Sequence, residues 1–207
     1  MNDIVVIGVC GKIGHGKDTL SDYLVENYGF EKLSLAKPIK QAVSALYNIP
    51  MQTMEDRVLK ETIDPRWNKS PRQILQWLGT EVLRNNDKDH LTKLCKYKIN
   101  HIINDTTTTT KRIVISDVRF DNEAQMIREF QHYYNITNDF TIKTEIIKVD
   151  ATTRLLKNNE TINETSSTRK HASESGISPE LIGITVYNNK DQVHFLNTID
   201  EIITEIV

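Results

Sequence analysis

The chain has 207 residues, enough for one substantial domain with a buried core. Its formal net charge of −2 offers no basic surface suited to nucleic acid or to an anionic membrane, so neither is expected as a partner. The two cysteines, Cys10 and Cys95, lack metal-ligand spacing and are interpreted as small buried apolar groups. These features favour a soluble protein of the reducing cytoplasm.

The first third of the chain alternates strand and helix patterns. Residues 4–9 form a nearly continuous β-branched run, typical of a strand that is covered on both faces. Residues 19–27 carry apolar side chains at helical spacing, and residues 30–35 resemble a second strand. A second helix is predicted to begin at Pro38, because proline is favoured in the first turn.

The middle of the chain is predicted to be helical. Helices are expected over residues 53–61, from Ser70–Pro71 onward, and over residues 91–103. No strand pattern separates them. A helical block between strands, here about residues 50–104, is where a lid or a ligand-binding subdomain is inserted.

The strand and helix alternation resumes after a threonine-rich loop at residues 104–110. The expected elements are strands at residues 113–117, 140–149 and 182–187, and helices at residues 121–132 and 191–206. The segment 152–178 is polar and holds several basic side chains. The alternation predicts an α/β fold with a mostly parallel sheet, and ligands bind such sheets at the carboxyl ends of the strands.

A glycine-rich turn joins the first predicted strand to the first predicted helix. Residues 11–17 match the phosphate-binding pattern G-x-x-x-x-G-K in the strand-to-helix setting that the pattern requires. Gly11, Gly14 and Gly16 allow the backbone to curl, so that successive N–H groups point at phosphate oxygens beside the positive end of a helix. This predicts a P-loop for a nucleotide. The alternative is a glycine-rich turn without a ligand.

The residues around the lysine refine this prediction. Lys17 is expected to bridge the β- and γ-phosphates, with Thr19 close by. Asp18 stands where the pattern has Ser or Thr for magnesium. A carboxylate there can ligate Mg²⁺, directly or through water, but repels a metal-free triphosphate, so strict metal dependence is expected. His15 is interpreted as a solvated spacer of the ATP-binding loop rather than as a catalyst.

Asp117 and Arg119 follow the predicted strand at residues 113–117. Asp117 occupies the place of a Walker B acid, which holds Mg²⁺ through water, although it could instead cap the next turn. Arg119 would lie at the same edge of the sheet, where a guanidinium holds phosphate bidentately. Arg72 and Arg84 lie twelve residues apart on the helical block, hence only partly on one face, and spacing alone leaves open a surface role for each.

With these residues in hand, the chain resembles the deoxynucleoside monophosphate kinases of tailed phages and large DNA viruses. Several independent blocks in register carry the resemblance, which runs nearly end to end. The blocks are Gly-Lys-Asp-Thr at residues 16–19, Leu-Ala-Lys-Pro-Ile-Lys at 35–40, Ser-Pro-Arg-Gln-Ile-Leu-Gln-Trp-Leu-Gly-Thr-Glu at 70–81, Asp-Val-Arg-Phe at 117–120, and His-Ala-Ser-Glu at 171–174.

The resemblance implies a P-loop NTPase fold of the nucleoside monophosphate kinase type, as a single domain over residues 1–207. It also implies a helical acceptor-binding insertion at about residues 50–104, a lid at about 152–178, ATP as cosubstrate, Mg²⁺ as metal and a nucleoside monophosphate as acceptor. A homodimer and, for a virus-encoded protein, the host cytoplasm are compatible with it.

The resemblance also assigns residues by position. Lys37, Arg72, Arg84 and Arg119 become acceptor-site residues. Arg169, where the lid returns to the sheet, is expected to contact the transferring phosphate, so that Lys17, Arg119 and Arg169 form the catalytic set. Asn188 and Asn189, after the last strand, are expected beside the adenine of ATP.

Two other interpretations stay open at this point. The first is a related P-loop kinase with another phosphorylated acceptor, such as phosphomevalonate or dephospho-coenzyme A. The second is a nucleotide-binding protein that never turns over. A GTPase switch loses its main support, because the guanine-reading pattern Asn-Lys-X-Asp is replaced by Asn189-Lys190-Asp191.

Overall fold

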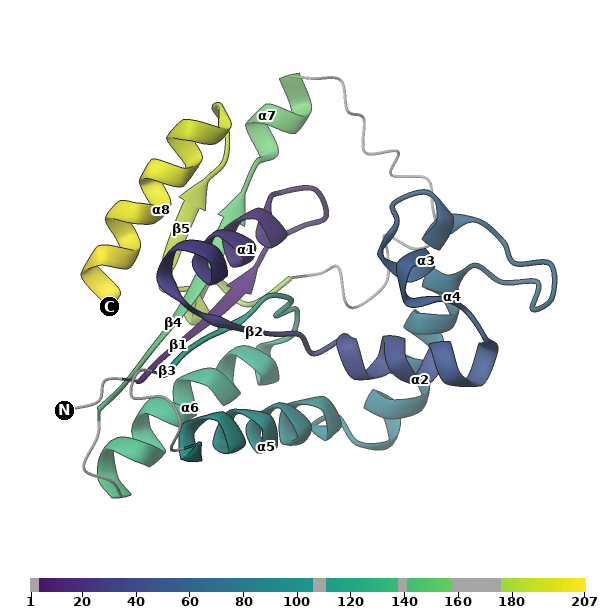
Figure 1. The fold of residues 1–207 in the computed structure, drawn as a ribbon, viewed down its shortest axis with the longest axis horizontal. Coiled ribbons are helices and arrows are strands. Elements are labelled where there is room, and N and C mark those ends of the chain that lie inside the picture. Colours follow the sequence, from purple (N-terminus) through teal and green to yellow (C-terminus); the bar gives the residue numbers. More distant parts are fainter. Residues whose placement is uncertain (1–3, 106–110, 138–140, 158–175) are drawn as a thin grey trace. The chain divides into compact units, whose positions relative to one another are not determined.

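The computed structural model describes residues 4–105, 111–137, 141–157 and 176–207. The chain divides into two compact units. Unit 1 comprises Met1–Leu33 and Cys95–Val207, and unit 2 comprises Ser34–Leu94. Figure 1 shows the elements of both in chain order.

Unit 1 is built on a five-stranded parallel sheet with the strand order β2-β3-β1-β4-β5. The strands are β1 (Ile4–Cys10), β2 (Glu31–Leu33), β3 (Lys111–Ile115), β4 (Ile142–Asp150) and β5 (Ile184–Tyr187). The central strand β1 is buried along its whole length, as its β-branched run predicted. In the register of the sheet, Val6 stands beside Ile113 of β3 and Thr144 of β4. The predicted α/β fold with a parallel sheet is therefore confirmed.

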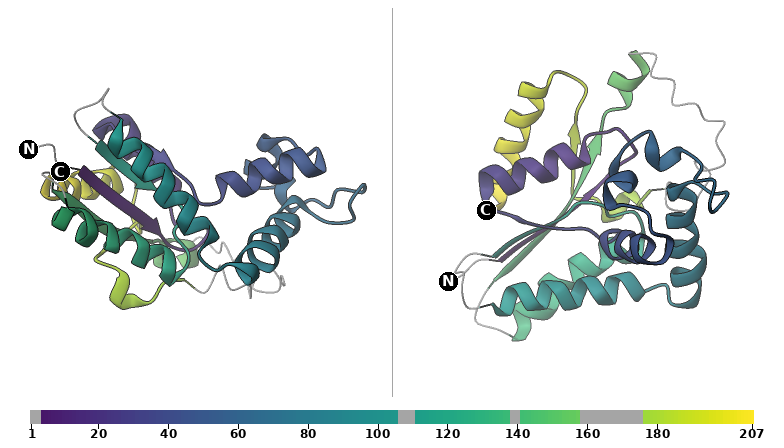
Figure 2. Two further views of the ribbon diagram at one scale, coloured as in Figure 1. Left: turned by 90° about the horizontal axis from the view of Figure 1, so that it is seen from below. Right: turned by 45° about the vertical axis from the view of Figure 1, so that its right-hand side comes forward.

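Helices cover both faces of this sheet (Figures 1 and 2). Helices α1 (Lys17–Tyr28) and α8 (Gln192–Ile206) pack on one face, where Leu20 and Phe195 belong to a single apolar core with Ile7 of β1. Helix α6 (Asp121–Thr137) covers the other face. The residue at position 8 of β1 is glycine because a Cβ there would lie 2.6 Å from Ile127 Cδ1 of α6. Residues 95–104 of α5 (His90–Asn104) lie beside α6, and Lys96 pairs with Glu129 at 3.3 Å.

Unit 2 is helical and has a core of its own. Its helices are α2 (Lys37–Tyr47), α3 (Met51–Glu55), the 3₁₀-helix η1 (Leu59–Glu61), α4 (Pro71–Gln76) and the π-helix η2 (Trp77–Arg84), which continues α4. The buried core residues are Ile39, Val43, Ile49, Met54 and Ile74. A capping box begins α4, because Ser70 Oγ accepts from the Gln73 N–H and Gln73 Oε1 accepts from the Ser70 N–H.

Three element predictions need correction. The continuous helix over residues 53–61 is wrong: α3 ends at Glu55, and the Asp56 carboxylate accepts the N–H groups of Val58 and Leu59, both at 2.8 Å, to begin η1. The strand expected at residues 113–117 ends at Ile115, so Asp117 lies two residues beyond it. Helix α7 (Thr152–Lys157) occupies the start of a segment for which the sequence predicted no helix.

Both cysteines are buried, as predicted. Burial raises the pKa of the Cys10 thiol to about 11 and that of Cys95 to about 12, so both remain protonated at neutral pH. Within the described ranges, none of the helices combines the length and the apolar character that crossing a membrane requires.

Candidate active site

The glycine-rich loop leaves the carboxyl end of β1 and enters α1 at Lys17. Gly11 and Gly16 have φ angles of 140° and 108°, a region that favours glycine. Close packing also excludes side chains here. A Cβ on Gly11 would lie 2.5 Å from the Val149 carbonyl, and one on Gly16 would lie 2.5 Å from Asn188 Nδ2. The loop is therefore held closely against the end of β4 and against the residue that follows β5.

The side chain of Lys17 folds back over this loop. Its ammonium donates to the Gly11 carbonyl at 2.8 Å and to the Lys12 carbonyl at 2.9 Å. This places a positive charge inside the curl of the loop, beside the N-terminus of α1, where two independent effects favour an anion. The arrangement suits the phosphates of a nucleotide.

His15 is buried, with 3% of its surface exposed, so the interpretation of this residue as a solvated spacer is wrong. Its Nδ1 accepts the Ala151 N–H at 3.1 Å and lies 3.2 Å from the Val149 carbonyl oxygen and 3.9 Å from Asp150 Oδ1. Burial lowers the pKa of this imidazole. A neutral ring that accepts at Nδ1 therefore joins the loop to the end of β4. Spacing within the P-loop pattern gave no sign of this, because the partner is 136 residues away.

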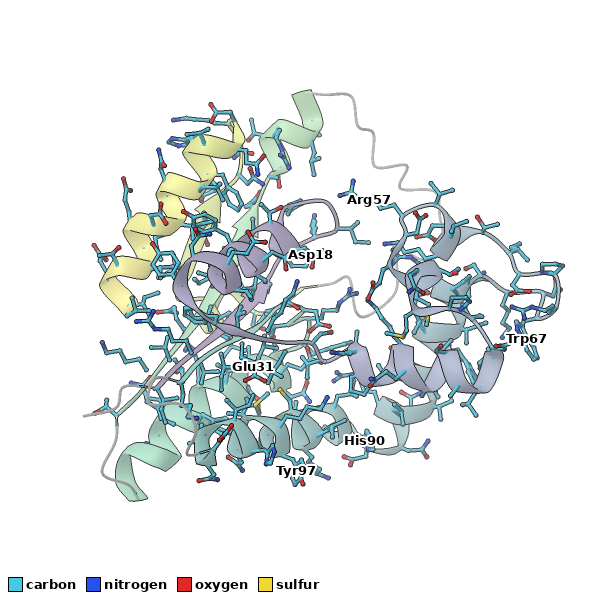
Figure 3. The ribbon with its side chains drawn as sticks, in the orientation of Figure 1. Asp18, Glu31, Arg57, Trp67, His90 and Tyr97 are labelled. Atoms are coloured by element: carbon cyan, nitrogen blue, oxygen red, sulfur yellow. The ribbon has the colours of Figure 1, made fainter. Side chains whose placement is uncertain are left out.

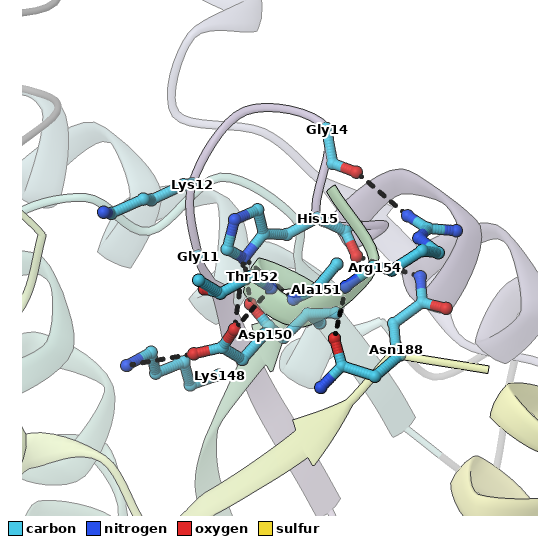
Figure 4. A network of polar contacts seen from close by, with 12 residues as sticks. Gly11, Lys12, Gly14, His15, Lys148, Asp150, Ala151, Thr152, Arg154 and Asn188 are labelled. Atoms are coloured by element: carbon cyan, nitrogen blue, oxygen red, sulfur yellow. Dashed lines mark hydrogen bonds and ion pairs between the residues drawn. The ribbon is translucent and has the colours of Figure 1, made fainter. Parts of the chain in front are cut away.

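Asn188 and Arg154 lie beside the same loop (Figure 4), and Asn189 contacts Arg154. Asn188 is buried, and its Nδ2 donates to the His15 carbonyl at 3.0 Å. Asn189 Oδ1 accepts the Arg154 N–H at 3.2 Å, and Arg154 Nη2 donates to the Gly14 carbonyl at 3.3 Å. The sequence did not single out Arg154 as a site residue. Its position just after β4, the neighbour of β1 in the sheet, is the signal that would have found it.

Asp18 and Thr19 lie in the first turn of α1 and are exposed. The Asp18 side chain keeps 88% of its surface exposed, and its nearest described cation is Lys32, at 3.8 Å. Figure 3 shows Asp18 at the start of α1. Its carboxylate is thus available to solvent beside the phosphate-binding loop.

Asp117 and Arg119 lie in the connection between β3 and α6. The Val118 N–H donates to the Val9 carbonyl at 3.0 Å, which holds Asp117 next to the carboxyl end of β1. The buried Glu123 accepts the N–H groups of Arg119 and Phe120 at 2.8 and 3.1 Å and so fixes the start of α6. The structure therefore places Asp117 and the P-loop at the same edge of the sheet.

The acceptor-site candidates Lys37, Arg72 and Arg84 all belong to unit 2. Arg72 Nε donates to Glu61 Oε1 in an ion pair, and Arg84 Nη1 donates to the Lys88 carbonyl at 3.4 Å. Lys37 is exposed in the first turn of α2. Lys60 lies close enough to Arg72 for the guanidinium to lower its pKa, although burial is the larger cause. Unit 2 thus holds a cluster of cations around α4 and η1.

The π-helix changes the relation between Arg72 and Arg84. Twelve residues of α-helix make about 3.3 turns, which would leave the two arginines on different faces. A π-helix closes its hydrogen bonds from i to i+5 and takes roughly one residue more per turn than an α-helix. Because residues 77–84 are π-helical, the two arginines are separated by about three whole turns. The expectation of a partial match is thus corrected: both lie on one face.

The predicted lid residues and the predicted metal site are the two parts of the site that remain to be located. Arg169 and the block at residues 171–174 fall within 158–175, which the structure does not describe. Among the residues it does describe, no three His, Cys, Asp or Glu side chains gather as a metal site. Magnesium in kinases is usually held by one or two carboxylates and by the nucleotide phosphates, so Asp18 and Asp117 remain a fitting donor set.

A family model for deoxynucleotide monophosphate kinases matches residues 5–64, which contain the P-loop. A protein of Acanthamoeba polyphaga mimivirus, whose name assigns it provisionally to these kinases, is 34% identical over 177 residues, covering 78% of this chain and 92% of that protein. The chain belongs to the deoxynucleotide monophosphate kinase family.

Members of this family are P-loop phosphotransferases that use ATP. The fold agrees with this membership. A crystal structure from Chloroflexus aurantiacus, whose title provisionally describes a kinase, aligns over the whole of both chains with a TM-score of 0.52 at 13% identity. That likeness concerns the fold alone. The prediction of the family, made from the five sequence blocks, is confirmed.

Proposed function

We propose that this chain transfers the γ-phosphoryl group of ATP to a deoxynucleoside monophosphate, giving ADP and the nucleoside diphosphate. The folded P-loop, with the Lys17 ammonium inside its curl, is the observation that carries the proposal. In the reaction a phosphate oxygen of the acceptor forms a bond to the γ-phosphorus, and the bond from that phosphorus to the β-phosphate oxygen breaks.

The donor site is assigned to unit 1. The backbone N–H groups of residues 11–17 would bind the phosphates, and Lys17 would exchange its carbonyl partners for phosphate oxygens. His15, Asn188 and Arg154 would keep the loop in shape through their contacts with Ala151, His15 and Gly14. Asn188 and Asn189 were expected beside the adenine. The hydrogen bond from Asn188 to the His15 carbonyl supports a role in holding the loop as well.

Asp18 and Asp117 would hold Mg²⁺ together with the phosphates. The exposed carboxylate of Asp18 in the first turn of α1 supports this assignment. The metal supplies positive charge to the β- and γ-phosphate oxygens. Thr19, in the same turn, is the candidate hydroxyl beside it.

The acceptor site is assigned to unit 2, with Lys37, Arg72 and Arg84 as its cations. The acceptor role of Arg119, a residue of unit 1, stays a prediction from the sequence resemblance. The ion pair with Glu61 supports Arg72 as a positioned guanidinium, because an oriented guanidinium can hold phosphate bidentately. Arg169 is proposed as the lid arginine. Three further points stay predictions from the sequence. They are the division into a kinase domain with an acceptor-binding insertion and a lid, the homodimer, and the cytoplasmic location.

An acceptor panel tests the proposal. Purified full-length protein is incubated with ATP, Mg²⁺ and one of dTMP, dGMP, dCMP, dAMP, phosphomevalonate or dephospho-coenzyme A, and ADP formation is measured. We expect turnover with at least one deoxynucleotide, at a rate well above that without acceptor. Turnover with only phosphomevalonate or only dephospho-coenzyme A would show that the acceptor is that compound and not a deoxynucleotide. Background rates with every acceptor would favour a nucleotide-binding protein without turnover.

A further inference from the structure

Gln76, the last residue of α4, has an unusual side-chain environment. Its amide nitrogen Nε2 is buried and has no hydrogen-bond partner in the described part of the chain. An amide nitrogen can only donate, and a buried donor without a partner costs stability. Groups of this kind are uncommon in folded proteins and call for an explanation, of which a ligand is one.

The position of Gln76 on its helix links it to the two arginines. Gln76 follows Arg72 by four residues, and residues so spaced in an α-helix lie on one face. The π-helix η2 then brings Arg84 back to this face, as shown above. Arg72, Gln76 and Arg84 therefore form a stripe along α4 and η2, in which Gln76 lies between the two arginines along the helix axis. π-Helical turns are rare in proteins and are found frequently at functional sites.

Charge and polarity differ along this stripe. Arg72 lies in the cation cluster with Lys60 and with the Glu61 carboxylate. Gln76 is neutral, and Leu75 and Leu78, one residue before it and two after it, pack against the apolar core of unit 2. A phosphate suits the guanidinium groups, whereas a neutral donor in apolar surroundings suits a flat heterocycle that carries a carbonyl oxygen or a ring nitrogen.

We propose that Gln76 is a specificity-determining residue, whose amide N–H donates to an acceptor atom on the base of the acceptor nucleotide while the arginines of the same stripe hold its phosphate. This inference rests on the proposed function, since it names the part of the acceptor that Gln76 contacts. A site that holds a buried donor discriminates strongly between bases that do and do not present an acceptor atom to it.

The test compares kcat/KM for dTMP, dGMP, dCMP and dAMP between the full-length wild type and two variants. Gln76→Met keeps the length of the side chain and removes its donor. Gln76→Glu keeps the shape and replaces the donor by an oxygen. In each variant we expect the ratio of kcat/KM between the best and the poorest acceptor to fall at least tenfold, through loss on the best one, while the KM for ATP changes less than twofold. Gln41→Met, on the exposed surface of α2, is the matched control.

A stability measurement separates this role from a structural one. Because Gln76→Met removes an unpaired buried donor, the melting temperature of the unliganded variant should equal or exceed that of the wild type. A ratio that changes less than tenfold in both variants, or an equal loss on all four acceptors, overturns the inference and leaves the kinase function standing. A wild type that phosphorylates none of the four acceptors overturns both.

Discussion

Lys17 is the residue on which the proposed phosphoryl transfer depends most directly, through its ammonium group. It makes two hydrogen bonds to carbonyl groups of its own loop, at the start of α1. In phosphoryl transfer the protein contributes mainly positioning and charge, and a lysine in this loop supplies both to the phosphates. Its removal should therefore affect turnover far more than stability.

Lys17→Ala should lower kcat/KM by about a hundredfold or more, because a preorganised charge lost from the transition state typically costs about 3 kcal/mol. Steady-state ADP formation measures this effect. The matched control is Lys12→Ala, which removes an exposed lysine of the same loop and should cost less than tenfold. Equal losses in the two variants would assign the effect to general charge on the loop rather than to Lys17.

The buried His15 side chain should make the stability of the protein depend on pH. Burial lowers its pKa in the folded protein below the value of about 6.5 in the unfolded chain. The unfolded chain then binds the proton more readily, so stability is complete above pH 6.5 and decreases as the pH falls through the folded pKa. Asp150, whose Oδ1 lies 3.9 Å from His15 Nδ1, favours the charged ring, whereas burial and the charges of Lys17 and Lys12 favour the neutral ring.

The variant His15→Asn tests this dependence, because the amide oxygen of asparagine can accept the Ala151 N–H without titrating near neutrality. Thermal unfolding is followed between pH 7.5 and pH 5. The melting temperature of the wild type should decrease more between pH 7.5 and pH 5 than that of the variant. Parallel curves would show that other groups, and not His15, determine stability at acid pH.

At the scale of elements, local patterns predicted most of the sheet and helices, and contacts between distant segments account for the failures. The β-branched run at residues 4–9 and the P-loop pattern are local, because each depends only on neighbouring residues. The structure confirms the strand and the turn that they predict. The burial of His15 depends on residues 149–151, which no local pattern connects to it. The alignment of Arg72 with Arg84 depends on a π-helix that apolar spacing did not reveal.

The capping box of α4 offers a test at this scale. Ser70 is buried, and its hydroxyl accepts the Gln73 N–H at the start of the helix that carries Arg72 and Gln76. Ser70→Ala should reduce the free energy of unfolding by about 1 kcal/mol, the usual cost of a lost N-cap. Chemical denaturation measures it. Ser44→Ala, in the interior of α2, removes a hydroxyl without a cap and should be neutral or slightly stabilising. Equal effects would show that the cap contributes nothing.

At the scale of the whole molecule, the proposed donor and acceptor sites belong to different compact units, each with its own apolar core. The P-loop, Asp18 and Asp117 are in unit 1, whereas Arg72, Gln76 and Arg84 are in unit 2. Binding of the donor alone should therefore stabilise the protein without an acceptor. Ligand binding to the folded state adds a free energy that depends only on affinity and concentration.

A non-hydrolysable ATP analogue with Mg²⁺ should raise the melting temperature, and at a hundredfold excess over Kd the stabilisation is about 2.7 kcal/mol. Without metal the shift should be much smaller, because the exposed Asp18 carboxylate repels a bare triphosphate. Asp18→Asn removes that repulsion and should increase the metal-free shift. Asp22→Asn, one turn further along α1 and also paired with Lys32, is the matched control and should behave as the wild type. If the wild type showed the same shift in melting temperature with and without Mg²⁺, the proposal that the Asp18 carboxylate makes nucleotide binding depend on the metal would be refuted.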